Sequence, residues 1–164
     1  MTPSSREIIE FWTMAQLMQW PRPLSLERGL SNEAAEYLCD VGLPRVTDTP
    51  FEIDHRVEAL PRLGKSLVVI AYDGIVPIGI DLAANERVVS AEPKSPARFF
   101  NSSVIHFGAS LYFFRRLSRP DTGEGDRLAS ETLKSSLLKL DPAALSDPKH
   151  CWSQILDQMA QGML

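Results

Sequence analysis

Apolar residues recur at helical spacing in the first part of the chain. Over 5–19 they fall three and four positions apart behind Ser5, a possible N-cap, which predicts a helix that the PRP sequence at 21–23 ends. A second helix is predicted over 32–41, with Ser31 as its N-cap. Gly42 and Pro44 would end this second helix, and Ala34, Leu38 and Val41 would form its buried face.

The pattern changes to that of strands between residues 66 and 92. Segment 66–71, SLVVIA, is apolar on both faces and therefore typical of a central strand, and Asp73 and Gly74 suit a turn after it. Two further strands are predicted over 77–82 and 86–92. Because a parallel connection needs about a dozen residues or more, the short connections between these strands predict an antiparallel meander.

A third helix is predicted within FFNSSVIHFGASLYFF, residues 99–114, where an apolar stripe begins at Val104. Its first backbone N–H groups need acceptors, and Ser103 is the favoured N-cap because the stripe starts at the next residue. The alternative is catalytic, with His106 activating the hydroxyl of Ser102 or Ser103. No acid lies nearby in the sequence to orient the imidazole ring, so capping is the favoured interpretation.

Two more helices are predicted near 127–140 and 149–161, after a polar loop at 118–126. The order of the elements predicts an α+β fold, with N-terminal helices, a central antiparallel sheet and C-terminal helices packed on it. A chain of 164 residues suits a single domain with one core, and we expect 1–164 to be that domain.

Composition argues against several classes of protein. No apolar run approaches the roughly 20 residues of a membrane helix. The first residues include acids and show no signal-peptide pattern, so we expect a cytoplasmic protein. Cys39 and Cys151 are far apart and outside any CxxC or Cys/His cluster, so the sequence predicts neither a disulfide framework nor a zinc site.

Charge is distributed unevenly along the chain. The net charge of −4 argues against a primarily nucleic-acid-binding surface. Residues 1–60 carry ten acids and five bases, 61–120 carry four acids and eight bases, and 121–164 carry seven acids and four bases. The three sections therefore have net charges of −5, +4 and −3. Such an asymmetry can mark a charged partner, although most charged runs are solvated faces.

An acidic stretch occupies residues 33–58, which carry a net charge of −5. Within it, like charges three and four apart on one helix face cost about 0.2–0.5 kcal/mol per pair. Asp40 would also lie at the negative end of the helix dipole, at a further cost of roughly 0.3–1 kcal/mol if exposed. A basic partner would relieve this repulsion. A solvated surface is the simpler interpretation, and the alternative is a partner-binding surface of Glu33, Glu36, Asp40, Asp48, Glu52 and Asp54.

Other residues that could carry chemistry form weaker patterns. His55 stands beside several carboxylates, but such a neighbourhood is common by chance, and we predict no metal site. Asp73 before Gly74 is interpreted as a turn residue and not as a catalytic acid. The glycines form neither a dinucleotide-binding nor a phosphate-binding loop, so no cofactor is predicted.

Several segments, taken in order, resemble one family. They are YLCDVGLP at 37–44, LVVIAYDGIVPIGIDL at 67–82, ERVVSAE at 86–92, FFNSSVIHF at 99–107 and the C-terminal LDPAAL and CWSQILDQMAQGML. By their order and spacing the chain resembles the SUKH (Smi/Knr-like) superfamily, and specifically its fourth immunity-protein subfamily. The resemblance covers most of 35–164, and residues 1–30 would be a divergent helical extension.

The resemblance implies a protein that binds and neutralises a cognate toxin, often a nuclease or deaminase delivered by a competing cell. It implies no catalytic residues, and the expected mechanism is stoichiometric occlusion of the toxin. The acidic stretch leads us to expect a basic toxin, with no direct binding of nucleic acid or membrane. Two alternatives stay open: a regulatory interaction scaffold with the same fold, and a small-molecule enzyme with a pocket near His55, Asp73 or His106.

Overall fold

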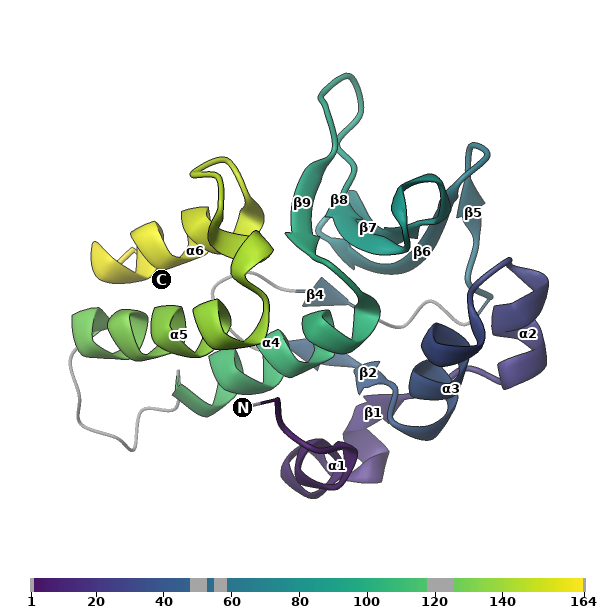
Figure 1. Ribbon diagram of the computed structural model, residues 1–164, viewed down its shortest axis with the longest axis horizontal. Coiled ribbons are helices and arrows are strands. Elements are labelled where there is room, and N and C mark those ends of the chain that lie inside the picture. Colours follow the sequence, from purple (N-terminus) through teal and green to yellow (C-terminus); the bar gives the residue numbers. More distant parts are fainter. Residues whose placement is uncertain (1, 48–52, 55–58, 118–125, 164) are drawn as a thin grey trace.

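The computed structural model describes residues 2–47, 53–54, 59–117 and 126–163, and confirms the predicted α+β fold (Figure 1). The helices that precede the sheet are α1 (Ser5–Trp12), α2 (Arg22–Glu27) and α3 (Asn32–Asp40). The helices that follow it are α4 (Val104–Leu117), α5 (Asp126–Leu140) and α6 (Cys151–Ala160).

The sheet is built around the predicted meander. β6 (Leu67–Asp73), β7 (Val76–Asp81) and β8 (Arg87–Ser90) pair antiparallel in sequence order. β9 (Arg98–Asn101) adds a strand beside β8 that the sequence analysis missed. On the far side of β6, short strands extend the sheet: β3 (Val46–Thr47), β4 (Ile53–Asp54) and β5 (Arg62–Leu63).

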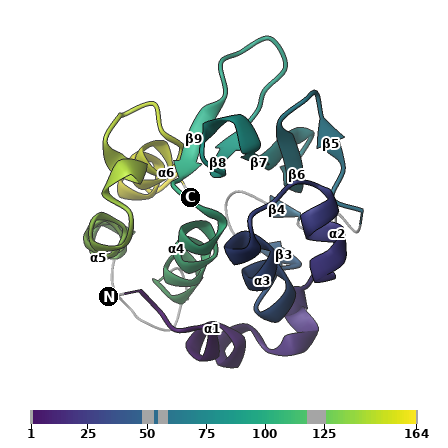
Figure 2. The same cartoon turned by 45° about the vertical axis from the view of Figure 1, so that its right-hand side comes forward.

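The main core lies between the sheet and the helices. Figures 1 and 2 show α4 running beneath the sheet, with α5 on one side of it and α3 on the other. Val68, Ile80 and Val88 form one row across β6, β7 and β8, and all three are fully buried. The same apolar cluster takes in Leu38 of α3, Phe107 and Leu111 of α4, and Trp152 of α6.

The opposite face of the sheet carries a smaller apolar row. Val69, Gly79 and Val89 lie side by side across β6, β7 and β8, and Phe99 continues the row on β9. A Cβ atom at Gly79 would lie 2.7 Å from Cγ of Leu67, so a larger residue there would displace that side chain. The row ends at Phe99, which is only partly buried.

The first helix is shorter than predicted. It ends at Trp12 and not near residue 19, because Thr13 adopts a φ of 61°, which interrupts the helical backbone. Its N-cap is Ser4 and not Ser5. Ser4 and Glu7 form a capping box, in which each side chain bonds to the backbone N–H of the other residue.

The residues after α1 pair with a later segment. Following a 3-10 turn at Met14–Gln16, β1 (Leu17–Met18) pairs antiparallel with β2 (Leu43–Pro44). The PRP sequence was expected only to end a helix, but it begins α2, with Pro21 as the N-cap. Pro23 follows in the first turn of α2, where a proline is tolerated because its fixed φ is helical and its missing N–H has no helical acceptor.

α3 has the start, end and buried face that the sequence predicts. The Ser31 hydroxyl accepts a hydrogen bond from the Ala34 N–H at 3.2 Å, and Gly42 takes a φ of 78° just past the end. The inner residues Ala34, Leu38 and Val41 are buried. The outer face of α3 is therefore turned to solvent.

Candidate partner-binding surface

Three acidic residues occupy the outer face of α3. Glu33, Glu36 and Asp40 are exposed, as their spacing in the sequence predicts. The helix that carries them is anchored at its N-terminus to the turn before β8, where the Ser31 N–H and hydroxyl both donate to the carboxylate of Glu86. A surface held in this way loses little conformational freedom on binding.

These acidic residues border a shallow hollow among three helices, which we call the α3 hollow. Its volume is about 300 Å³, near the lower limit of ligand pockets, so it suits a single side chain better than a large ligand. Its lining consists of Ser5 from α1, Ile105 from α4, and Glu33, Glu36, Tyr37, Asp40 and Val41.

The three carboxylates have no partner within the part of the chain that the structure describes. None of them takes part in an ion pair or accepts a side-chain hydrogen bond there. Their mutual repulsion and the dipole cost at Asp40 are therefore not offset by the described fold. The charge is available to solvent or to a partner.

Tyr37 forms the floor of the α3 hollow and was not singled out by the sequence analysis. Its hydroxyl lies against Gly108 of α4, where an added Cβ would overlap it. The hydroxyl has no hydrogen-bond partner in the described residues, and burial raises the pKa of Tyr37 well above its ordinary value. A glycine inside the apolar stripe of α4 was the only signal of this close approach in the sequence.

The other three predicted binding residues are not brought to this hollow by the described structure. Asp48 and Glu52 lie outside the described residues. Asp54 is described only as a backbone position in β4, paired with Tyr72 of β6. Of the six predicted binding residues, the structure therefore brings together Glu33, Glu36 and Asp40 at this hollow.

The polar residues before α4 belong to a buried hydrogen-bond network. Asp141 is 3% exposed, and its carboxylate accepts from Asn101 Nδ2 at 3.0 Å and from the Ser102 N–H and hydroxyl at 2.8 Å each. Asn101 also donates to Ser110 Oγ and accepts from the Trp152 indole N–H. These contacts connect β9, α4 and α6 and leave Ser102 committed to structure.

The Ser103 and His106 pair forms a helix cap. Ser103 Oγ accepts a hydrogen bond from the His106 N–H at 3.3 Å and lies 3.0 Å from His106 Nδ1. His106 thus stands at the third helical position, where a capping box would carry Glu or Gln. The predicted cap is confirmed, and the hydroxyl is engaged by the backbone as well as by the ring.

The sequence profile of the SUKH-4 immunity protein family matches residues 23–158, which is most of the chain. The chain belongs to this family. Searches of curated proteins and of solved structures returned no match. The resemblance to the fourth SUKH subfamily is therefore confirmed, and family membership implies an immunity role with a cognate toxin as partner.

In this SUKH-4 chain, the remaining candidates for chemistry lie in separate places, and one of them is outside the described residues. That residue is His55. Asp73 ends β6 before the turn, and burial raises its pKa although Arg98 opposes the shift. Burial also raises the pKa of Cys151 to about 12, which keeps its thiol protonated and unreactive at neutral pH.

Among the described residues, no cluster of three His, Cys, Asp or Glu side chains is arranged to hold a metal ion. None of the described helices has the length and hydropathy of a membrane-spanning segment.

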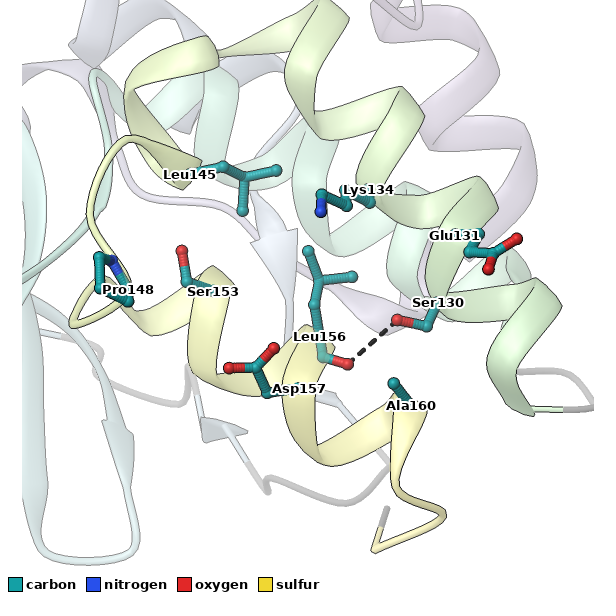
Figure 3. A pocket seen from close by; sticks show the side chains of 9 residues that line it. All are labelled: Ser130, Glu131, Lys134, Leu145, Pro148, Ser153, Leu156, Asp157 and Ala160. Carbon is teal, nitrogen blue, oxygen red and sulfur yellow. Dashed lines mark hydrogen bonds between the residues drawn. The ribbon is translucent and has the colours of Figure 1, made fainter.

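Two further hollows lie beside α6. Figure 3 shows the one between α5 and α6, of about 480 Å³, where Ser130 Oγ donates to the Leu156 carbonyl at 3.0 Å. Its walls mix the basic Lys134 with the acidic Glu131 and Asp157, so its net charge is only weakly negative. The other hollow, of about 570 Å³, lies between β9 and the start of α6.

Proposed function

We propose that this protein neutralises a basic toxin, such as a nuclease or deaminase, by binding it stoichiometrically in the cytoplasm and covering its active site or substrate groove. Family membership supports the immunity role. A standard protein interface of about 1,600 Å² in total would be large enough for such occlusion.

The observation that carries the proposal is the unpartnered acidic face of α3. Three exposed carboxylates on an anchored helix repel one another, and the described residues provide no cation to offset them. A basic patch on the toxin would remove this cost on binding and would be attracted from a distance. Nucleic-acid-directed enzymes need such basic surfaces for their own substrates.

The proposal assigns no bond-making step to the protein. The use of Ser102 and Ser103 in hydrogen bonds that fix the start of α4 supports this part of it. A substrate turned over by the purified protein, with activity lost on changing one side chain, would contradict it.

The test is co-expression with the toxin domain encoded beside the gene, followed by purification of the complex. We expect rescue of growth and a one-to-one complex. The combined change Glu33→Lys, Glu36→Lys and Asp40→Lys should weaken the complex by about a hundredfold or more, since each close charge pair can be worth more than 1.5 kcal/mol. The isosteric change to Gln, Gln and Asn should weaken it less.

The control places the same kind of charge change elsewhere. Glu27 in α2 and Asp157 in α6 are exposed and do not line the α3 hollow, so Glu27→Lys with Asp157→Lys should leave the affinity nearly unchanged. If the folded triple variant bound the toxin as tightly and as fast as the wild type, the α3 face would have no part in binding. If no neighbouring toxin were captured or neutralised, the immunity mechanism itself would fail.

A further inference from the structure

The hollow between β9 and α6, which we call the β9–α6 hollow, brings Arg87 and Arg98 from the positive section of the sequence together with Lys149 from the C-terminal section. It lies where the β8–β9 loop stands beside the loop that precedes α6 (Figure 1). Its volume of about 570 Å³ is well within the range of binding pockets. The lining residues used below are Arg87, Glu92, Arg98, Phe99, Lys149 and His150.

One wall of the β9–α6 hollow is aromatic and held in place. Phe99, at the end of the smaller apolar row, packs on His150 with ring centroids 4.9 Å apart and planes inclined by 44°. His150 Nδ1 lies 2.9 Å from the Ala143 carbonyl oxygen, which can only accept, so this nitrogen carries the proton. The two rings therefore form a preorganised aromatic surface, of which the Phe99 ring is the apolar part.

Arg98 ties the strand side of the hollow to the helix side. Its guanidinium donates to Gln154 Oε1 of α6 at 2.7 Å and to Glu92 Oε1 at 2.8 Å. Asp147, the other acid in the lining, accepts the Lys149 backbone N–H through Oδ1 at 2.7 Å. Both acids of the lining are thus already engaged within the protein.

Two cations of the lining are incompletely neutralised within the described residues. Arg87 Nη2 forms a long ion pair with Asp81 Oδ2 at 3.7 Å, beyond hydrogen-bond length, and nearly half of the Arg87 side chain is exposed. Lys149 is exposed, and its ammonium group forms no ion pair with any described residue. The first backbone N–H groups of α6 add a partial positive charge, and the N-cap residue His150 makes no side-chain capping bond to them. The site is therefore cationic beside an aromatic wall.

We propose that the β9–α6 hollow receives an acidic segment of a partner protein, with a carboxylate between Arg87 and Lys149 and a neighbouring apolar side chain on Phe99. The inference rests on the proposed function only in taking that partner to be the toxin. A single inorganic ion would leave the aromatic wall and most of the volume unused. A partner that meets acids at α3 and cations here could bind in only one orientation.

The test uses a short peptide as probe and does not need the toxin. Amide NMR spectra of the full chain are recorded at low ionic strength with the capped peptide acetyl-Asp-Glu-Phe-Glu-amide. We expect saturable shifts at amides of 87–99 and 147–154, with a Kd of about 1–10 mM, as befits a site that supplies only part of an interface.

Charge-reversal variants show whether peptide binding depends on Arg87 and Lys149. Lys149→Glu and Arg87→Glu should each lower the affinity for the peptide by about fivefold or more, because each turns an attraction into a repulsion. Lys139→Glu changes an exposed lysine of α5 outside the lining and should have no effect. The spectra also show whether each variant is folded.

Several results would overturn the inference. One is the absence of saturable shifts at amides near the hollow. Another is a loss of peptide affinity in Lys139→Glu as large as in Lys149→Glu or Arg87→Glu. A third is that inorganic phosphate at matched ionic strength binds there as tightly as the peptide, which would indicate a simple anion site. A fourth is shifts of the same amides on raising the protein concentration alone, which would indicate a second copy of the chain.

A second experiment, which measures toxin binding, separates this inference from the proposed function. If the wild type captures the toxin, Lys149→Glu should lower the affinity by about tenfold, and unchanged affinity would overturn the inference while leaving the immunity mechanism intact. If no toxin is captured, the proposed function fails, and the peptide titration alone decides whether the hollow binds acidic segments.

Discussion

The network around Asp141 and the acidic face of α3 differ in how their charges are satisfied. The buried Asp141 carboxylate accepts three hydrogen bonds from Asn101 and Ser102. The exposed carboxylates of α3 have no partner among the described residues. The first cluster explains how the chain folds, and the second costs stability without contributing to the fold. The charges of α3 therefore remain available to a partner, whereas the carboxylate of Asp141 does not.

The largest effect that would test this contrast is expected at Asp141. Asp141→Ala leaves the Asn101 amide and the Ser102 N–H without their acceptor, so we expect a loss of about 3 kcal/mol in the free energy of unfolding. Asp141→Asn keeps one oxygen for these donors and should cost only about 1 kcal/mol. Urea unfolding would measure both variants. A loss in Asp141→Ala no greater than in Asp141→Asn would mean that the network is not structural.

A smaller effect is expected at the contact between α3 and α4. Gly108→Ala places a methyl group on the Tyr37 hydroxyl, and such overpacking should cost about 2 kcal/mol. Tyr37→Phe removes an unpaired buried hydroxyl and should be neutral or slightly stabilising alone, and in the double variant it should restore part of the loss. Thermal unfolding of the three proteins checks this. Additive effects in the double variant would show that the two residues do not press on each other.

A third effect tests the α3 face by stability and affinity together. Asp40→Lys removes an acid from the C-terminal end of the helix, so we expect it to raise stability by about 0.5 kcal/mol while weakening toxin binding. Asp157→Lys makes the same change in the last turn of α6 and should raise stability without changing affinity. Chemical unfolding and binding titrations separate the outcomes. Equal affinities for the two variants would leave Asp40 without a binding role.

The smallest effect concerns Glu7 at the start of α1. The Ser4 backbone N–H and hydroxyl donate to its carboxylate and hold its pKa below the ordinary 4.5. The stabilisation from this capping box is thus present above pH 4.5 and lost as the pH falls through the lower pKa of the folded state. NMR titration should show the pKa of Glu7 moving part of the way back in Ser4→Ala, which keeps the backbone donor. No movement would exclude a role for the hydroxyl.

Local patterns predicted the parts of the fold that local chemistry determines. Ser31, Gly42 and Ser103 act as predicted because a cap depends on residues within one turn. The meander followed from short turns between apolar runs. β9 was missed because its four residues, RFFN, are too few to show a period. α1 was predicted too long because pairing with β2, far along the sequence, draws Leu17 out of the helical pattern.

The two candidate surfaces also differ in how far the sequence could predict them. Glu33, Glu36 and Asp40 share a helix face, so their spacing alone placed them together. The β9–α6 hollow joins residues such as Arg87 and Lys149, more than 60 positions apart, and only the folded arrangement brings them to one site. The sequence showed the positive charge of 61–120 but not where that charge would collect.

The β1–β2 pair has a consequence for where this protein can be cut. β1 precedes the segment that the family profile matches, yet Trp12, Leu17 and Trp20 are buried in the common core. A fragment designed to begin at residue 23 would strip β2 of its neighbour and open the interior to water. The cooperative unit of folding is therefore longer at its N-terminal end than the segment that the family profile matches.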